Sequence, residues 1–453
     1  MNAEYTDLTS SDFASSTLRV SGSQLHGGNI PVAGYKHAAV QLMAAAVIVN
    51  YPVEISNVPL IEDTRVLAEI IRWCGGQATQ TGHRLSVDAR SMSSADIPEA
   101  LSAPVHGSLY LIPSFLARLG EVEFGGSGGC QIGSSIMNGR RPVSHMISVM
   151  ERFGARFDQT DGRLRGYCPG FHATTLDILD YSDDDYAVNG PLVSGATKTA
   201  ILCALGCKDG ESHILHPYRK SDVLELLRFA RKCGFAVEMD AEGIRVARER
   251  EAKATTHDLM SCLSEIITYV SLAIHTGTPL QLTRVTPERA KEGLRPELEV
   301  LARMGVRLEW GQDSVLVAPP VTIYPTNIEV TSSGIFSDHQ PFFALMLAHA
   351  AGVSRIHERV WTERFHYVHG LSQLGARIAR QGSEIKVYPS DISCPGQTVT
   401  ANDLRAAAVL LLASLTVPGV TTIRNAYHLQ RGYENLVATL KVLGARIDEV
   451  TED

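Results

Sequence analysis

One glycine-rich stretch of this 453-residue chain carries a single cysteine together with two adjacent arginines. It runs from Phe124 to Ser144 and reads FGGSGGCQIGSSIMNGRRPVS, with Cys130 behind four glycines and Arg140 and Arg141 further on. Because glycine at this density disfavours the interior of helices and strands, the stretch predicts a mobile surface loop. Fixed positive charge favours the thiolate, so the loop could present a reactive thiol. An incidental cysteine in a flexible loop is the alternative, although free cysteines normally prefer burial.

Length and composition bound the class of protein. A chain of 453 residues predicts at least two domains. The net charge of -8 and the pI of about 6.1 give no global basic surface for nucleic acid, so an anionic ligand needs a local cluster of Lys and Arg. The eight cysteines form no CxxC pair and match no zinc spacing, which predicts reduced thiols in a cytoplasmic protein. The Ser/Thr/Asp-rich start predicts a frayed tail rather than a signal peptide, and no apolar stretch predicts a membrane span.

The elements that must position this loop form a repeated pattern. An amphipathic helix ending in a hydrophobic residue and glycine, followed by a strand, recurs at intervals of 79, 80, 71, 70 and 69 residues. The six glycines, each predicted to take a left-handed helix cap, are Gly75, Gly154, Gly234, Gly305, Gly375 and Gly444. Alanine- and leucine-rich helices alternate with this pattern and are predicted to be buried, with the sheets outside them. Six units divide most simply into two domains of three, and the charged stretch 245–258 is the candidate crossing point.

Short motifs in a fixed order then indicate a family. They are GYKHAAV (34–40), GGCQIG (128–133), RRPVS (140–144), SGATKTA (194–200), SDHQ (337–340), TERF (362–365), NDLRA (402–406) and HLQRGYE (428–434). With the repeats, they make the chain resemble the enolpyruvyl transferases from about residue 18 to residue 447, most of all those that use UDP-N-acetylglucosamine. The resemblance implies an α/β fold of two inside-out barrel domains, each of three repeats, with the active site in the cleft between them. Residues 35–259 would form the first domain and carry the Cys130 loop, and residues 1–34 with 260–453 would form the second.

The reaction of that family moves the enolpyruvyl group of phosphoenolpyruvate onto an acceptor hydroxyl with loss of phosphate. The resemblance assigns five cations to phosphoenolpyruvate and its phosphate, namely Lys36, Arg141, Arg364, Arg405 and Arg431. Hydrogen bonds between such cations and phosphate or carboxylate oxygens contribute about 1.5–3 kcal/mol each. A solvated surface charge is the alternative for any one of them. The resemblance implies no metal ion and no organic cofactor.

The same resemblance assigns the proton transfers. Asp338 would accept the proton of the acceptor hydroxyl, with a helix N-cap as its alternative role. Asp403 would orient or buffer the reacting carbons, with a helix cap or an ion pair to Arg405 as its alternative. Cys130 would protonate the vinyl carbon, because a thiol with an ordinary pKa of about 8.5 is mostly protonated at pH 7. Lys36 would take part in catalysis as well as binding. The resemblance also implies that fosfomycin alkylates Cys130 and that the loop closes over the bound acceptor.

Eight residues are assigned to the acceptor by the resemblance, namely His37, His106, Arg141, Pro142, Val143, Ser194, Gly195 and Asp338. On this side the chain departs from the family pattern. Histidine stands at 37 where the family has asparagine, and at 106 where it has arginine. Glu62 and Pro191 replace lysines, and CLSEIIT at 262–268 lacks the family's Asp and Arg. The segment between the loop cysteine and the following arginine is about six residues longer.

The acceptor therefore stays open between several interpretations. A uridine nucleotide such as UMP, as used by enolpyruvyl transferases of nucleoside-antibiotic pathways, fits the loss of cationic contacts best. UDP-N-acetylglucosamine, the acceptor in cell-wall synthesis, is the second hypothesis. Shikimate 3-phosphate fits less well, because the sister family that uses it lacks the Gly-Gly-Cys loop. A paralogue that binds nucleotide without catalysis is the remaining alternative, and the oligomeric state is not predicted.

Overall fold

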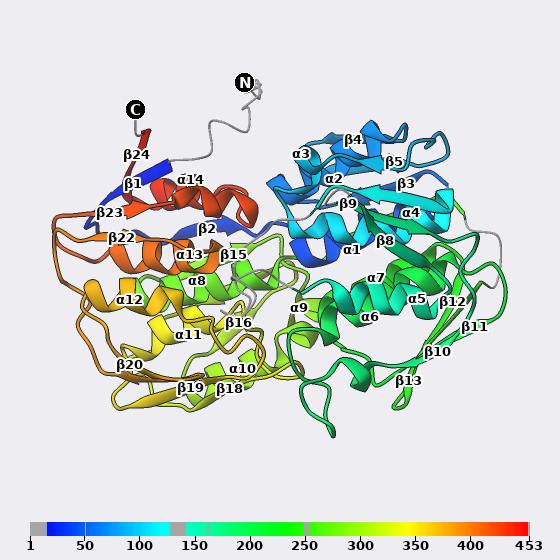
Figure 1. Ribbon diagram of the computed structural model, residues 1–453. Helices are drawn as coiled ribbons and strands as arrows, with labels where there is room; N and C mark the ends of the chain where they lie inside the picture. The colour runs from blue at the N-terminus through cyan, green and yellow to red at the C-terminus, as the bar shows by residue number, and fades with distance from the viewer. Residues whose placement is uncertain (1–15, 50, 127–141, 161–162, 249–252, 452–453) are drawn as a thin grey trace.

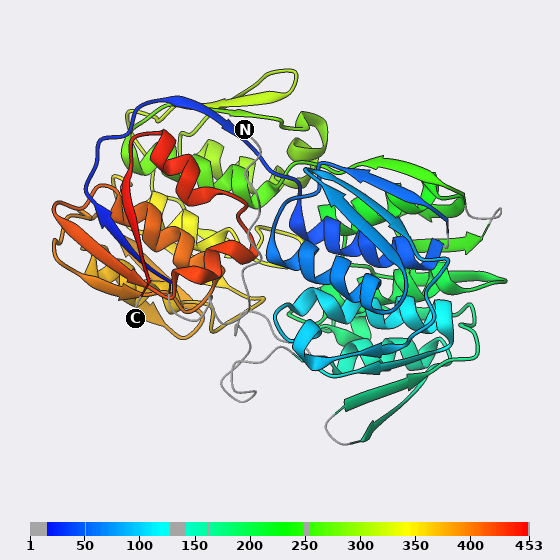
Figure 2. The same ribbon diagram turned by 90° about the horizontal axis from the view of Figure 1, so that it is seen from above.

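The computed structural model describes residues 16–49, 51–126, 142–160, 163–248 and 253–451. Figure 1 shows strands and helices gathered into two groups, and Figure 2 shows the same two groups from above. The predicted α/β class is confirmed. Cys130 and Arg141, two residues to which the sequence assigns chemistry, lie outside the described residues.

Six four-stranded sheets occur in the described part of the chain, and all share one pattern of parallel and antiparallel neighbours. In each sheet the first two strands are parallel, and the remaining neighbours are antiparallel. Three sheets belong to one group: β14 (Thr255–Asp258), β3 (Val53–Ser56), β5 (Arg84–Asp88) and β4 (Gln77–Thr81); β6 (Asp96–Ile97), β7 (Glu121–Phe124), β9 (Arg163–Tyr167) and β8 (Arg156–Thr160); β10 (Thr175–Asp177), β11 (Glu211–Leu215), β13 (Gly243–Arg248) and β12 (Phe235–Met239). The other group holds β2 (Gly28–Pro31), β15 (Leu280–Thr283), β17 (Ser314–Val317) and β16 (Leu308–Trp310); β18 (Ile328–Val330), β19 (Ser354–Glu358), β21 (Glu384–Tyr388) and β20 (Arg377–Gln381); β22 (Thr398–Thr400), β23 (Val420–Arg424), β1 (Ser16–Ser21) and β24 (Arg446–Thr451).

Helices form the interior of each group. The first group contains α1 (Lys36–Val49), α2 (Glu62–Trp73), α3 (Glu99–Ser102), α4 (Leu111–Leu119), α5 (Ser144–Arg152), α6 (Val193–Gly206) and α7 (Ser221–Lys232), with short 3-10 helices η1 (His106–Tyr110) and η3 (Ile178–Tyr181). The second contains α8 (Leu263–Thr276), α9 (Pro287–Gly293), α10 (Arg295–Arg303), α11 (Gln340–Leu347), α12 (His366–Gln373), α13 (Leu404–Ser414) and α14 (Leu436–Val442), with η4 (Ala426–Arg431). Helices α1, α6, α8, α11 and α13 are apolar on nearly every face and almost wholly buried. The burial predicted for the alanine-rich helices is therefore confirmed.

The six predicted glycine caps are also confirmed. Each of the six glycines has a positive φ, between 84° and 115°, and each lies directly between a helix and an edge strand of a sheet. Side chains other than glycine rarely adopt this backbone conformation. The regular spacing of these glycines thus records where six helices turn into strands.

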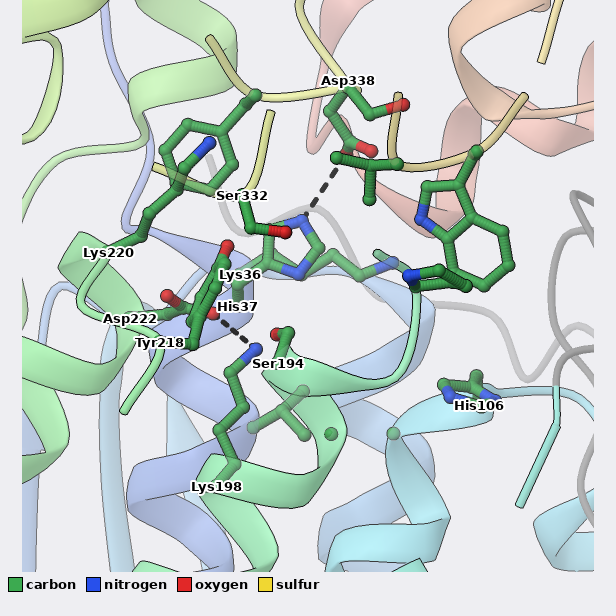
Figure 3. A pocket seen from close by; sticks show the side chains of 18 of the residues that line it. Lys36, His37, His106, Ser194, Lys198, Tyr218, Lys220, Asp222, Ser332 and Asp338 are labelled. Atoms are coloured by element: carbon green, nitrogen blue, oxygen red, sulfur yellow. Dashed lines mark hydrogen bonds and ion pairs between the residues drawn. The ribbon is translucent and has the colours of Figure 1, made fainter. Parts of the chain in front are cut away.

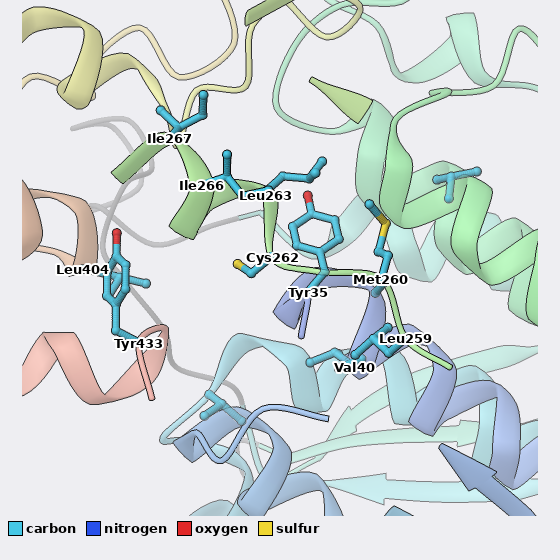
Figure 4. Close-up of a cluster of buried hydrophobic side chains, with 14 of the residues drawn as sticks. Tyr35, Val40, Leu259, Met260, Cys262, Leu263, Ile266, Ile267, Leu404 and Tyr433 are labelled. Carbon is cyan, nitrogen blue, oxygen red and sulfur yellow. The ribbon is translucent and has the colours of Figure 1, made fainter. Parts of the chain in front are cut away.

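The chain passes between the two groups twice, and the two passages lie side by side. Gly34 forms a β-bridge with Ser261, the N–H of Tyr35 donates to the carbonyl of Met260 (2.9 Å), and a second bond of 2.7 Å joins Cys262 N–H to the Ala33 carbonyl. Figure 4 shows the buried side chains around this double crossover. The crossing follows Asp258 rather than falling within 245–258, because residues 255–258 still pair with β3 as strand β14.

A carboxyl group fastens the crossover. Oε2 of Glu265, in the first turn of α8, accepts the N–H of Ala33 at 2.8 Å. The side chain is buried, and this burial raises the pKa of Glu265 to about 7. The segment 262–268, one of the departures noted in the sequence, therefore supports the crossover through Cys262 and Glu265.

Gly34 leaves no room for a side chain at this crossover. A Cβ there would lie 1.7 Å from the Asn57 carbonyl oxygen. We expect Gly34→Ala to lower the free energy of unfolding by at least ~2 kcal/mol, because backbone on both sides would have to move. Urea unfolding of this variant measures the loss.

Gly170→Ala is the matched control for that experiment. A Cβ at Gly170 would have no atom within 4 Å, and its φ is not in the left-handed region. The control should stay within about 0.5 kcal/mol of the wild type. Equal stability of both variants would contradict the tight crossover.

Candidate active site

A cavity of about 190 Å³ lies where the two groups meet. Its wall is built mainly from the first turns of α1, α6, α7 and α13, from η1, and from the loops that precede α11 and α12. Most of its polar side chains therefore stand at helix starts, where unpaired backbone N–H groups add positive potential. Figure 3 shows these side chains pointing into a shared space. The site is suited to anionic ligands.

Lys36 occupies the first position of α1 and connects the two sides of the cavity. Its Nζ donates to Oδ2 of Asp63 at 2.9 Å and to the backbone carbonyl of Arg431 at 2.6 Å. The first partner lies in α2 and the second in η4, so this ammonium group contacts both groups of sheets. Lys36 and Arg431 both line the cavity, and both are among the five cations assigned to phosphoenolpyruvate.

Asp338 is the most heavily bonded carboxylate in the described cavity wall. Oδ1 accepts from Nη1 of Arg364 at 2.6 Å, and Oδ2 accepts from Nη2 and Nε of Arg405 at 2.8 and 3.1 Å. Nε2 of His37 lies 3.3 Å from Oδ2 and carries the proton, because a carboxylate only accepts. Burial alone would raise the pKa of Asp338, but the two guanidinium charges outweigh it and hold that pKa well below its usual range.

His37 is the only link to Asp338 that comes from the first group among these contacts. Burial lowers the pKa of His37, although the bond to Asp338 opposes the change, so the ring is neutral at pH 7. The imidazole thus donates one neutral hydrogen bond into the site. It does not add a positive charge.

Arg405 is held in place by contacts with Asp403 and Tyr433. It lies in the first turn of α13, whose N-cap Asp403 accepts the backbone N–H groups of Arg405 and Ala406 at 2.7 and 2.9 Å. Its Nη1 donates to the hydroxyl of Tyr433 at 2.9 Å, and that hydroxyl lies 2.8 Å from Oγ1 of Thr268. Asp403 is buried and does not line the cavity, so its helix-cap role is what the structure describes.

The residues assigned to the acceptor divide in two. His37, His106, Pro142, Ser194, Gly195 and Asp338 line the cavity. Val143, the N-cap residue of α5, does not line the cavity. Arg141 lies outside the described residues. Gly195 has a packing reason to be glycine, since a Cβ there would lie 2.3 Å from Nε2 of His145.

Several cavity residues were not predicted from the sequence. Lys198 forms an ion pair with Asp222 and lies between the rings of Tyr110 and Tyr218, at 5.9 and 5.8 Å from their centroids. Lys220 begins the same helix as Asp222 and also lines the cavity. The charged residue within SGATKTA was a visible signal for Lys198. Nothing in the spacing marked the other four.

One of the departures from the family pattern lies away from the cavity. Glu62 is on the outer face of α2 and pairs with Arg65 at 2.6 Å. Three others, at positions 37, 106 and 191, line the cavity. Among the departures that the structure describes, these three line the cavity, and the longer segment before Arg141 lies outside the described residues.

Comparison with known proteins identifies the family. The model of EPSP synthase (3-phosphoshikimate 1-carboxyvinyltransferase) matches residues 20–440. A UDP-N-acetylglucosamine 1-carboxyvinyltransferase from Caulobacter sp. (strain K31) is 30% identical, with 95% of this chain and 96% of the relative covered. A protein of that name from Campylobacter hominis is 29% identical, with 96% and 99% covered. The chain belongs to the EPSP synthase family and is an enolpyruvyl (1-carboxyvinyl) transferase that uses phosphoenolpyruvate.

Solved structures agree with this assignment. The enolpyruvyl transferase NikO from Streptomyces tendae superimposes with a TM-score of 0.90 at 36% identity, covering 97% of this chain and all of that one. EPSP synthase from Acinetobacter baumannii gives a TM-score of 0.70 at 15% identity, which shows the fold alone. The predicted enolpyruvyl transferase resemblance is confirmed. Among the helices that the structure describes, none has the length and apolar character needed to cross a membrane.

The Asp338 network generates a direct test. Asp338→Asn removes the charge shared by two arginines and the only carboxylate that faces His37 among the described contacts. We expect kcat to fall by about 10²–10⁴-fold, the range for loss of a positioned proton acceptor. Phosphate release at saturating substrates measures the loss.

Asp209→Asn, on an exposed loop, is the control and should leave kcat unchanged. A rise confined to the KM of phosphoenolpyruvate would show that Asp338 only orients the arginines. Full activity would exclude it from the chemistry.

Proposed function

We propose that this enzyme transfers the enolpyruvyl group to a hydroxyl of a uridine nucleotide, most closely UMP. The observation that carries the proposal is that positions 37, 106 and 191, where the chain departs from the family pattern, all line the cavity. At these positions a neutral histidine, a second histidine and a proline replace the family's amide or cationic side chains. Fewer polar and cationic contacts fit a smaller acceptor than a nucleotide sugar.

The proposed domain bounds are residues 35–259 for the first domain and 1–34 with 260–453 for the second. Pairing of β1 with β23 and β24, and of β2 with β15, supports counting the N-terminal strands with the second domain. The common pairing pattern of the six sheets supports three repeats in each. The double crossover at 33–35 and 260–262 then joins the domains, and the site lies between them.

In the proposed mechanism, phosphoenolpyruvate binds to the cations of the cavity. These are Lys36, Arg364, Arg405 and Arg431, with Arg141 as the fifth. Arginine forks suit phosphate and carboxylate oxygens bidentately. The acceptor hydroxyl oxygen bonds to C2 of phosphoenolpyruvate while its proton passes to Asp338 and C3 gains a proton from Cys130. A C3 proton then returns to the Cys130 thiolate while phosphate departs from C2 with the proton held by Asp338, which restores the vinyl group and both side chains.

Asp338 needs the substrate in order to act as a base. In the free protein the two guanidinium groups of Arg364 and Arg405 depress its pKa and so weaken its basicity. Substrate anions that bind these arginines offset part of their positive charge, which raises the pKa of Asp338. A carboxylate thereby becomes a better base only when phosphoenolpyruvate is bound. Asp403 contributes by capping α13 and fixing Arg405.

The acceptor can be tested with two nucleotides at matched concentrations. We expect phosphate release from phosphoenolpyruvate with UMP, at a kcat/KM at least ~100-fold above that with UDP-N-acetylglucosamine. Phosphoenolpyruvate without nucleotide is the blank. Turnover with UDP-N-acetylglucosamine alone would make this a cell-wall enzyme and overturn the proposal. Nucleotide binding without release from either would favour the non-catalytic alternative.

The role of Cys130 is tested by substitution and by alkylation. We expect Cys130→Ser to lower kcat by about 10²–10⁴-fold, because a serine hydroxyl is a far weaker acid. Fosfomycin should add one label to the wild type, detected by mass spectrometry of peptides. Cys394→Ser is the matched control, since Cys394 is the exposed cysteine among those described. It should keep both turnover and labelling. Full turnover of Cys130→Ser would remove the thiol from the mechanism.

A further inference from the structure

Lys220 differs from the other lysines and from the two buried arginines of the cavity. It precedes α7 as its N-cap residue and lines the cavity. Its Nζ lies 3.9 Å from the centroid of the Phe336 ring and donates to the backbone carbonyl of Thr331 at 3.3 Å. Within the described part of the chain it pairs with no carboxylate.

Four neighbouring cations each contact a carboxylate, although two of them share one. Lys36 pairs with Asp63, and Lys198 pairs with Asp222. Arg364 and Arg405 share Asp338. Each of these four charges has a counter-ion inside the protein, which is what burial of a charge normally requires.

Burial therefore disfavours the charged form of Lys220 without a paired carboxylate among the described residues to compensate. The side chain is partly buried, and this burial lowers the pKa of Lys220 to about 8, although more distant carboxylates oppose the change. At pH 7 the ammonium group is still mostly protonated. Its described contacts are a carbonyl and an aromatic ring, and neither is a counter-ion. An anionic ligand could supply that counter-ion.

Position separates Lys220 from the cations proposed to hold phosphoenolpyruvate. Figure 3 shows Lys220 and His106 on opposite sides of His37, with Asp338 between them near the top of the view. A hydroxyl that reacts beside Asp338 leaves the rest of the acceptor to extend to one of these sides. On one side stands a cation and on the other a histidine.

We propose that Lys220 binds a phosphate group of the nucleotide acceptor. The inference rests on the proposed function, since it needs the acceptor to be a nucleotide. Both UMP and UDP-N-acetylglucosamine carry such a group, so the shared chemistry is a nucleotide phosphate, and the acceptor assay distinguishes its source. The alternative is a purely structural role, in which Lys220 joins the start of α7 to the Thr331 loop.

Uridine is the ligand that separates these roles, because it differs from UMP only by the phosphate. Calorimetry measures the affinity of the wild type, Lys220→Met and Lys220→Arg for both ligands without phosphoenolpyruvate, so that no turnover occurs. We expect Lys220→Met to weaken UMP binding at least tenfold and to leave uridine binding unchanged. Lys220→Arg should restore UMP binding to within about threefold of the wild type.

Lys232→Met is the matched control, since Lys232 is an exposed lysine at the other end of α7. It should bind both ligands like the wild type. Equal loss for UMP and uridine in Lys220→Met would establish the structural role and overturn the proposal, as would unchanged UMP binding. If Lys220→Met does not fold, the wild type decides: UMP affinity should fall above pH 8 while uridine affinity stays level, and a level UMP profile would overturn the proposal.

Failure of the proposed function gives a different result. If the wild type turns over UDP-N-acetylglucosamine and not UMP, the acceptor assignment is wrong and the lysine is tested with that nucleotide in the same variants. A tenfold rise in its KM with unchanged kcat would keep the phosphate role of Lys220. An unchanged KM would remove it.

Discussion

The pairing of Asp338 with two arginines is the interaction on which the site depends. Three segments distant in sequence meet at one carboxylate: the loop before α11, the loop before α12, and the first turn of α13. Two guanidinium groups close together would repel each other, and the shared carboxylate offsets that repulsion. His37 extends the network into the other group of sheets. The geometry of the cation cluster is thus set before any substrate arrives.

That network can span the two groups only because the crossover fixes how they meet. The paired segments 33–35 and 260–262 are joined by backbone hydrogen bonds and buried among apolar side chains. Gly34 lets the backbone of Asn57 approach, and Glu265 anchors one strand of the pair. The crossover leads directly into α1 on one side and α8 on the other. Lys36 and His37, the first two residues of α1, are therefore positioned by the same contacts that join the groups.

The sequence predicted elements better than it predicted neighbours. Six glycine caps, buried alanine-rich helices and the family could be read from it, because each depends on local pattern or on motif order. Four of the five cations that it assigned to phosphoenolpyruvate line the cavity, yet it missed Lys220 and Asp222. Their importance arises from tertiary packing of the start of α7 against Phe336 and Lys198, and no local spacing encodes that contact. Asp403 shows the converse: a motif residue whose described contacts are those of a helix cap.

Charge balance explains how Asp338 could act as the base of the proposed mechanism while it contacts two arginines. An aspartate that binds two arginines is a poor base, and a free aspartate at this depth would cost several kcal/mol to keep ionised. A substrate that is itself an anion resolves the conflict, because it takes over the arginines at the moment when the base is needed. By linkage, a ligand that raises the pKa of Asp338 when it binds must itself bind more tightly when Asp338 is protonated. In the proposed mechanism the acceptor hydroxyl is then activated only beside bound phosphoenolpyruvate, so the ion pairs that organise the free site also keep Asp338 a weak base until the substrate binds.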